Sequence, residues 1–378
     1  MREGWIKDKQ IILYGCGMEG ERFLARHPGL FDRIYFCIDR SRQGTFHGKP
    51  IKKIEEVIDS CSEYRIIITT LPSTYLRIRE ILLQYGLTEF SDFVYMVYLE
   101  KKMVLINANC HGGALAHYLT SSKCFNSAFQ IYQLPEIQDN EEKSISPYVL
   151  ENADVFIHQD IRKENRYSEM LSDDYLLSKL QYNCKKVAIP NFVGMGGFLF
   201  PQQGINARKA MTDHGEISLL YEDLILEEAV RMGMRTLKEF IDYYMEYEYS
   251  EAFLEELYRR DRKKIQRREE NWDVKVWEFF EKHRKDMLFF IDKDHPSTSV
   301  MEYIGWKTLE ILTGKSVAVN KEFEYEIGMP MPMVPSVKRH YQITPEEEDA
   351  AHYYGCTVSD LIPTYVKTYL WITHDIKL

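Results

Sequence analysis

The chain has 378 residues, 45% of them apolar and 28% charged, so it is long enough for two globular domains and lacks the composition of a disordered protein. Its 48 Lys plus Arg against 58 Asp plus Glu give a net charge of −10, which disfavours broad nucleic-acid binding but leaves local phosphate sites open. The start MREGWIKDKQ lacks a signal-peptide pattern and no run reaches the roughly 18 apolar residues of a membrane helix, so we expect a cytoplasmic protein without membrane insertion.

The first hundred residues alternate strand and helix patterns. Short apolar runs at 10–17, 33–39, 64–72 and 93–99 are typical of buried strands, and amphipathic segments lie between them. This alternation predicts a Rossmann-like, doubly wound α/β domain over residues 1–100.

A GxGxxG pattern, GCGMEG, stands between the first predicted strand and the first predicted helix. Gly15 would make the turn, Gly17 would let a pyrophosphate approach the backbone, and Gly20 would let helix and strand pack. Asp39 ends the next strand, where its carboxylate could accept a hydrogen bond from a ribose hydroxyl. The same glycines also serve packing when no nucleotide binds, so both interpretations stay open. The stretch FCIDRSRQGTFHGKPI resembles Rossmann-like domains joined to glycan-biosynthesis enzymes, which implies NAD(P) or a sugar nucleotide as ligand.

The strand and helix pattern restarts after residue 101, where we expect a domain boundary. Strand patterns at 103–109, 154–160 and 185–191 predict a second α/β domain over residues 101–378. A largely helical region of about 216–290 is predicted as an insertion into it. The predicted fold class is therefore α/β with two domains.

The segment NANCHGGAL follows the apolar run MVLI and opens a predicted helix. Cys110 would lie at the positive end of that helix, where the pKa of a thiol falls and a thiolate can act as a nucleophile. Asn107 and Asn109 could orient the turn or donate to an oxyanion, while Gly112 and Gly113 would let a ligand approach backbone donors. A cysteine in such a turn is also common as a small buried packing residue, so the motif alone does not distinguish a nucleophile from a structural cysteine.

A second polar motif, Asp292-Lys293-Asp294-His295, lies near the end of the helical region. An acid that orients a histidine, a histidine that takes a proton, and a nucleophile on a strand-to-helix turn are the parts that acyl transfer needs. Their order resembles that of the SGNH hydrolases, with Cys110 at the usual serine position. The alternative is that the motif is a turn in which Ser297 caps the next helix.

Four segments together resemble the WcbI family, enzymes of capsular polysaccharide biosynthesis with an SGNH-like α/β core. They are NANCHGGAL, HQDIR at the end of a strand, the Gly-rich loop IPNFVGMGGFLFP, and DHPS, and they span most of residues 103–312. The resemblance implies binding of coenzyme A or acetyl-CoA, with Cys110 and His111 on the first motif, Gln159 and Arg162 on the second, and His295 on the last.

This sequence also departs from the family pattern. Where the family commonly has NCQ this chain has NCH, which leaves the role of His111 open, and a long charged segment precedes the late histidine. Within that segment, RRDRKKIQRR could bind coenzyme A phosphates, but a solvated helix face is the favoured interpretation.

We therefore predict an acyl-CoA-dependent O-acyltransferase that acts on a sugar or glycan intermediate of polysaccharide biosynthesis, with acetyl as the expected acyl group. Its catalytic residues would be Cys110, His295 and Asp292 (or Asp294), with Asn109, Gly112 and Gln159 near the oxyanion and His111 and Arg162 near the substrate. The alternatives are an SGNH-like esterase or deacetylase and a nonenzymatic nucleotide-binding module. No metal is expected, because His111, His158 and His295 have no ligand spacing within one element. Whether the chain forms a homo-oligomer is left open.

Overall fold

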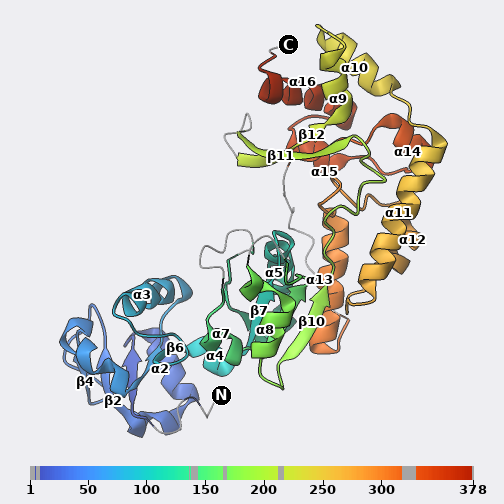
Figure 1. Ribbon diagram of the computed structural model, residues 1–378. Helices are drawn as coiled ribbons and strands as arrows, with labels where there is room; N and C mark the ends of the chain where they lie inside the picture. The colour runs from blue at the N-terminus through green and yellow to red at the C-terminus, as the bar shows by residue number, and fades with distance from the viewer. Residues whose placement is uncertain are drawn as a thin grey trace. The chain divides into compact units, whose positions relative to one another are not determined.

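The computed structural model describes residue 5 and residues 9–135, 137, 144–164, 168–211, 217–316 and 329–376. Most of the amino-terminal stretch used to judge a signal peptide lies outside these residues. The chain divides into two compact units: the first comprises 1–107, 123–157 and 161–186, and the second comprises 108–122, 158–160 and 187–378. Both contain helices and strands, which confirms the α/β class (Figure 1).

The first unit begins with a six-stranded sheet in the order β3-β4-β2-β1-β5-β6. Its strands are β1 (Ile11–Tyr14), β2 (Ile34–Ile38), β3 (Thr45–Phe46), β4 (Lys49–Lys52), β5 (Arg65–Ile68) and β6 (Phe93–Tyr95), and its helices are α2 (Met18–Arg26), α3 (Pro72–Gln84) and α4 (Met96–Glu100). β1 pairs in parallel with β2 and β5, and all four of its residues are buried, as continuous apolar runs predict.

The four-stranded sheet of the chain has the order β10-β9-β7-β8. Its strands are β7 (Lys102–Asn107), β8 (Phe129–Ile131), β9 (Val155–Gln159) and β10 (Lys185–Ile189), and the first unit also holds the helices α6 (Lys123–Ala128), α7 (Pro147–Glu151) and α8 (Asp173–Lys179). The carboxyl ends of β9 and β10, and the residues that follow β7, belong to the second unit. Polar residues that follow these strands are therefore collected in one compact unit.

The second unit contains a strand hairpin and most of the helices. Its elements are α5 (His111–Ser121), β11 (Gln203–Met211), β12 (Ile217–Asp223), α9 (Leu224–Arg231), α10 (Leu237–Glu246), α11 (Glu251–Glu269), α12 (Trp277–His283), α13 (Thr298–Thr313), α14 (Pro335–Tyr341), α15 (Glu348–Tyr353) and α16 (Leu361–His374). The helices after the loop begin at Leu224 and not near residue 216, because 217–223 pairs with 203–211 as an antiparallel strand. None of the described helices is both long and apolar enough to cross a membrane.

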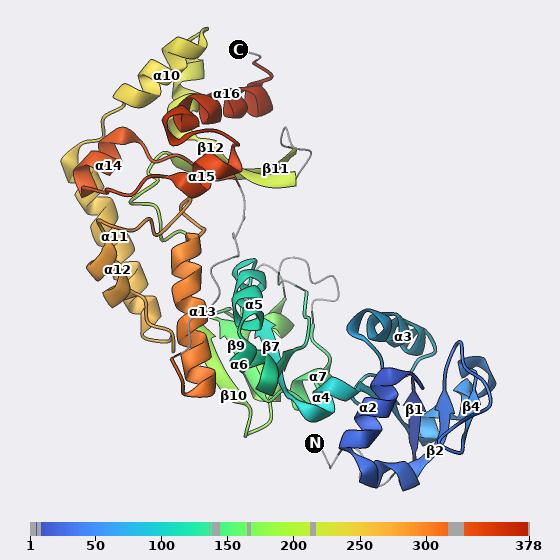
Figure 2. The same cartoon turned by 180° about the vertical axis from the view of Figure 1, so that it is seen from behind.

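Helix α13 packs directly against α5, and both views show the two helices side by side (Figures 1 and 2). A Cβ atom on Gly305 of α13 would lie 2.8 Å from Cβ of Tyr118 on α5, so only glycine permits this approach. The Tyr118 hydroxyl also donates to the Thr298 carbonyl at 3.3 Å. Since α13 starts just after the late Asp-x-x-His motif and α5 just after the cysteine turn, this packing brings the two motifs together.

Candidate active site

The cysteine turn places Cys110 at the N-cap of α5, and Cys110 is partly exposed. The Asn109 carboxamide oxygen accepts from the His111 backbone N–H at 3.0 Å, which closes the turn in the manner typical of asparagine. A side chain at this position lies within the positive end of the helix. Cys110 therefore occupies the place that the sequence predicted for it.

The imidazole of His295 is held by Asp292. Nδ1 of His295 donates to one carboxylate oxygen of Asp292 at 2.7 Å, and the other oxygen accepts from the backbone N–H groups of Asp294 and His295 at 2.7 and 2.9 Å. Asp292 is fully buried and His295 is 5% exposed. Of the two acids considered from the sequence, Asp292 is the one that contacts the ring, while Asp294 accepts from the backbone N–H of Gly194 at 2.6 Å.

Cys110, His111 and His295 meet in the second unit. One sulfur or ring-nitrogen atom from each lies within 4.8 Å of the other two. Burial by itself would lower the pKa of His295, but the charge and hydrogen bond of Asp292, together with Cys110, outweigh it and raise the pKa to about 10. An imidazole so placed keeps its proton at neutral pH and can share it with the adjacent sulfur.

The neighbouring imidazole of His111 is neutral and has a defined tautomer. The Gln159 carboxamide oxygen accepts from the Asn109 backbone N–H at 3.0 Å, and its nitrogen donates to the Pro190 carbonyl at 2.9 Å and faces Nδ1 of His111 at 3.2 Å. Nδ1 must then be the acceptor, so the ring proton sits on Nε2. Burial, followed by the charge of His295, lowers the pKa of His111 to about 3. Nε2 is buried and makes no hydrogen bond of ordinary length and angle with the described residues, although the backbone of Asp294 lies close enough to oppose the fall in the pKa of His111.

The same three side chains could also surround a metal ion, which the sequence did not predict. Two features resemble metal centres: thiolate and imidazole ligands, and a carboxylate behind one imidazole. The amide of Gln159 opposes this use of His111, because it places the proton on the nitrogen that would have to bind the metal. His158, buried at the end of β9, is not part of this group.

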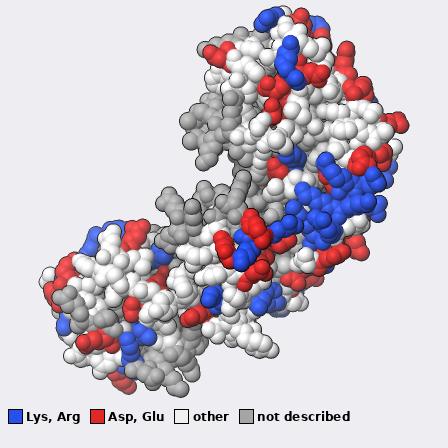
Figure 3. All heavy atoms as spheres, in the orientation of Figure 1, with Lys and Arg blue, Asp and Glu red and all other residues white. Residues whose placement is uncertain are grey.

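The Gly-rich loop after β10 is fixed by cations on α11. Lys264 donates to the carbonyls of Val193 and Gly194 at 3.0 and 2.9 Å, and Arg268 donates to the Asn191 carbonyl at 3.0 Å. The exposed cations of the same helix contribute to the gathering of Lys and Arg in Figure 3; they are Arg259, Arg260, Arg262, Lys263 and Arg267. The run RRDRKKIQRR is thus divided: one face holds a loop of the site and the other faces solvent.

Other predicted site residues lie at defined places. The backbone N–H of Gly112 donates to the Asn109 carbonyl at 2.8 Å and is occupied within the turn. Asn107 is buried in the first unit, where its amide donates to the Leu171 carbonyl at 3.3 Å. Arg162 is exposed and also belongs to the first unit. The backbone N–H groups of Asn109 and Gly112 and the amide of Gln159 are therefore used by the fold, whereas Nε2 of His111 makes no hydrogen bond of ordinary geometry with the described residues.

The predicted nucleotide site of the first unit shows which glycines the fold requires. Gly15 has φ +117°, and a Cβ there would lie 2.7 Å from the Thr69 carbonyl oxygen. A Cβ on Gly20 would lie 2.5 Å from the Gly15 carbonyl oxygen, whereas one on Gly17 would meet no atom within 4 Å. Packing explains the first and third glycines and does not explain the second.

Asp39 already has hydrogen-bond partners in the Gly-rich turn after β1 and in the loop after β2. One carboxylate oxygen accepts from the backbone N–H of Cys16 at 2.9 Å, and the other accepts from the N–H groups of Ser41 and Arg42 at 2.9 Å each. Burial alone would raise the pKa of Asp39, and these hydrogen bonds reverse the effect and lower it. A ribose hydroxyl would have to share this carboxylate with the loop.

Sequence reasoning missed two neighbours of the site. The ring of Tyr221 on β12 lies 6.3 Å from that of His295, and burial, followed by Asp294 and Asp292, raises the pKa of its hydroxyl. Phe192, fully buried, lies 6.1 Å from His111 between ring centroids. The aromatic residue in a Gly-rich loop was a usable signal for Phe192, while Tyr221 fell in a segment expected to be helical.

Comparisons with known proteins concern the fold and the family of the chain. A family model described as polysaccharide biosynthesis enzyme WcbI matches residues 103–313, more than half of the chain. A solved structure of a protein described as WcbI, a novel polysaccharide biosynthesis enzyme, in its native form without a disulfide bond between coenzyme A and one of its cysteines, superposes with a TM-score of 0.54. The two chains are 14% identical, and the match covers 70% of this chain and 94% of the other, which establishes a shared fold. A comparison with curated proteins found no match.

Proposed function

The chain belongs to the WcbI family of polysaccharide biosynthesis enzymes, and from this premise we propose that it transfers an acyl group, in the first instance acetyl, from coenzyme A to a hydroxyl of a sugar or glycan intermediate. One observation carries the proposal: a buried Asp292–His295 pair meets a partly exposed Cys110 at the start of a helix. The coenzyme A named for the structural relative supports the choice of donor.

The proposed reaction begins with the shared proton on the ring of His295, where the raised pKa of that ring holds it, and with the sulfur of Cys110 as a thiolate beside it. The thiolate attacks the thioester carbonyl, the bond from that carbon to the coenzyme A sulfur breaks, and His295 returns the proton to the departing coenzyme A thiolate. An acceptor hydroxyl then attacks the acyl-cysteine and His295 takes the hydroxyl proton. The bond from the acyl carbon to the sulfur of Cys110 breaks, and the sulfur leaves as a thiolate beside the protonated ring, as at the start. Asp292 keeps the ring oriented and stabilises its charged form throughout.

His111 would stabilise the tetrahedral intermediate in both steps. Its Nε2–H is buried, makes no hydrogen bond of ordinary geometry with the part of the chain that the structure describes, and belongs to the cluster of Cys110, His111 and His295. A neutral donor that is already oriented needs no reorganisation when negative charge develops on the carbonyl oxygen. Where the family commonly has Gln in its NCQ pattern, this chain has His111, and either side chain can donate a hydrogen bond.

The covalent route and direct transfer can be separated with one variant. Cys110→Ser is incubated with acetyl-CoA and a sugar acceptor, and product and protein mass are followed. We expect an acetyl adduct on wild-type protein and loss of both adduct and activity in the variant, while Cys356→Ala, which alters another partly exposed cysteine of the same unit, keeps both. Full activity of Cys110→Ser without an adduct would exclude the covalent route and favour direct attack of the acceptor on the thioester, with His295 as base.

An esterase or deacetylase would use the same residues with water as acceptor. Incubation with an acetylated sugar, with and without coenzyme A, distinguishes the two reactions. Release of acetate that is independent of coenzyme A would replace the proposed transferase by a hydrolase.

For the amino-terminal region we keep the proposal of a separate nucleotide-binding domain over residues 1–100. Packing does not require a glycine at position 17, which supports the proposal that a ligand approaches the backbone there. The hydrogen bonds that Asp39 already makes argue against a strong contact with a ribose hydroxyl. Thermal shifts with NAD(P) and with nucleotide sugars test it, since a ligand that binds only the native state raises the melting temperature.

A further inference from the structure

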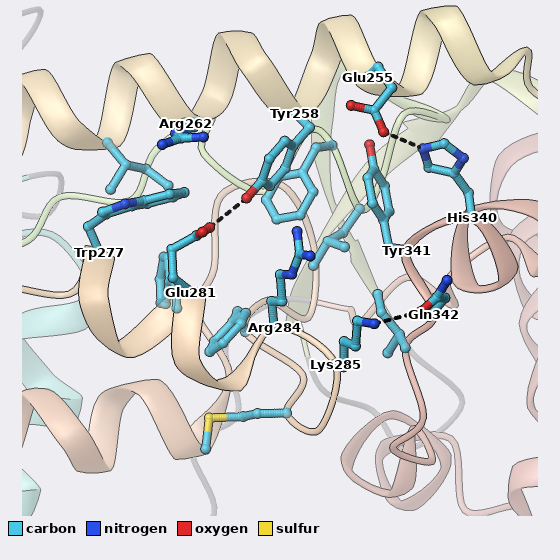
Figure 4. A pocket seen from close by; sticks show the side chains of 17 residues that line it. Glu255, Tyr258, Arg262, Trp277, Glu281, Arg284, Lys285, His340, Tyr341 and Gln342 are labelled. Carbon is cyan, nitrogen blue, oxygen red and sulfur yellow. Dashed lines mark hydrogen bonds and ion pairs between the residues drawn. The ribbon is translucent and has the colours of Figure 1, made fainter.

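A second concave site lies in the second unit, bounded by α11, α12, the segment after α12, and α14 (Figure 4). Its cavity has a volume of about 180 Å³, smaller than the roughly 300–1,000 Å³ of sites that enclose a whole ligand, so a ligand here would lie partly in solvent. Its base is apolar and includes the buried side chains of Ile265, Phe280 and Phe289. None of the residues discussed so far as catalytic lines this groove.

A layer of aromatic rings separates the groove from the cysteine site. Phe192 lies 6.1 Å from His111 and 6.2 Å from Phe280 between ring centroids, and Phe280 lines the groove. A molecule in the groove would therefore lie on the other side of Phe192 from the reacting sulfur. The groove is an additional binding site and not a part of the catalytic group.

The walls of the groove present aromatic rings that are only partly buried: Tyr258, Trp277 and Tyr341. The guanidinium of Arg262 lies 5.4 Å from the centre of the Trp277 ring, a distance typical of a cation–π contact. The hydrogen-bonding groups of the lining come in pairs, which Figure 4 marks with dashed lines. The Tyr258 hydroxyl donates to Glu281 at 2.6 Å, and Lys285 donates to Gln342 at 2.6 Å.

The mixture of charges selects among ligand classes. Two carboxylates, Glu255 and Glu281, face the groove together with the cations Arg262, Arg284 and Lys285. A polyphosphate would approach both carboxylates at an electrostatic cost, and an acyl chain would remove the paired charged groups from water without adding a hydrogen bond to them. A sugar fits both parts of the surface, because its C–H face can stack on aromatic rings while its hydroxyls donate to carboxylates and accept from Arg, Lys and Gln.

We propose that this groove binds a short oligosaccharide segment of the glycan on which the enzyme acts. The inference rests on the proposed function for the identity of the ligand, since the acceptor there is a glycan, yet binding in the groove requires no acyl transfer. It would hold the glycan chain at a distance from the acylated hydroxyl and so favour longer acceptors over monosaccharides.

The test measures binding without catalysis, in the full-length Cys110→Ala protein. Maltotriose, chitotriose and trigalacturonate serve as probes of neutral, N-acetylated and acidic sugars, followed by calorimetry and tryptophan fluorescence. At least one should bind, and Trp277→Ala should weaken that binding by roughly tenfold or more, because an aromatic platform at the centre of a site contributes strongly. Trp306→Ala is the matched control: Trp306 also stacks with a cation, Lys307 at 4.3 Å, but lies outside the groove, and its loss should leave binding unchanged.

Trp277→Tyr guards against a folding artefact, since it keeps an aromatic ring and should retain most of the binding at an unchanged melting temperature. The proposal is overturned if none of the three oligosaccharides binds, if Trp277→Ala has no effect, or if adenosine 3′,5′-bisphosphate binds and loses affinity on Trp277→Ala, which would make the groove a nucleotide site. Failure of the proposed transferase has a different signature, namely no acyl transfer by the wild-type enzyme while oligosaccharide binding persists.

Discussion

Two cysteines occupy matching places in the chain, each in the turn between a buried strand and the helix that follows. Cys16 follows β1 and is fully buried, and a hydrogen bond with Cys37, together with burial, raises the pKa of its thiol. Cys110 follows β7, is partly exposed, and lies beside the Asp292–His295 pair. Both turns open a helix, so the difference in their chemistry comes from residues that the rest of the fold brings to them.

The largest expected effect separates the two cysteines directly. Cys110→Ala should lower kcat for acyl transfer by roughly 10³-fold or more, because it removes the nucleophile. Cys16→Ala should leave kcat close to wild type and reduce the free energy of unfolding by about 1–2 kcal/mol, since only a buried sulfur is lost. Steady-state kinetics and urea unfolding measure the pair, and the comparison fails if Cys16→Ala is the inactive variant.

The second prediction concerns the tautomer of His111. Gln159→Glu would place a carboxylate opposite Nδ1, which would draw the ring proton to Nδ1 and remove the Nε2–H donor. We expect kcat to fall roughly 10²–10³-fold, the loss typical of one oxyanion donor, with a smaller change in KM for acetyl-CoA. Nitrogen-15 NMR of the His111 ring reports the tautomer, and an unchanged kcat with a switched tautomer would remove His111 from the mechanism.

The third prediction uses the charge of His295. Its pKa is raised in the folded protein to about 10, so protonation of this ring stabilises the fold fully below pH 6.5, and the contribution is lost as the pH rises towards 10. The unfolding free energy of wild type minus that of His295→Gln should therefore decline across this window by an amount on the order of 2–4 kcal/mol. Urea titrations at several pH values measure the difference, and a flat difference would mean that His295 is not charged beside Asp292 and Cys110.

Much of what the turns at Cys16 and Cys110 have in common could be predicted from the sequence, because strands, turns and helix starts depend on local patterns. Continuous apolar runs such as 11–14 indicated buried strands, and the Gly and Asn residues after them indicated turns. The place of Cys110 at a helix start followed from these signals. The spacing Asp-x-x-His likewise predicted the contact between Asp292 and His295.

Features that depend on pairing between distant segments were not predictable in this way. The second strand of the hairpin, 217–223, fell within the region of about 216–290 expected to be helical, since its residues show no strict alternation of apolar and polar side chains, and its pairing with 203–211 was not predicted. The partnership of Gln159 with His111 requires strands β7 and β9 in one sheet, and the role of Lys264 requires that one face of α11 meets the Gly-rich loop. Periodicity identifies a charged helix but not what its charges contact.

The smallest expected effect concerns the Gly-rich turn after β1 and whether a ligand binds there. Gly15→Ala should lower the unfolding free energy by about 1–3 kcal/mol, because φ +117° and the Thr69 carbonyl both oppose a side chain. Gly17→Ala meets no atom of the protein within 4 Å, so we expect a stability change within about 0.5 kcal/mol. If a dinucleotide or sugar nucleotide approaches this backbone, Gly17→Ala must nevertheless abolish the thermal shift that the ligand gives to wild type. If Gly17→Ala leaves the ligand-induced rise in melting temperature unchanged, the glycines after β1 serve packing alone. Of the two turns, only the one after β7 would then contribute residues to a ligand or catalytic site.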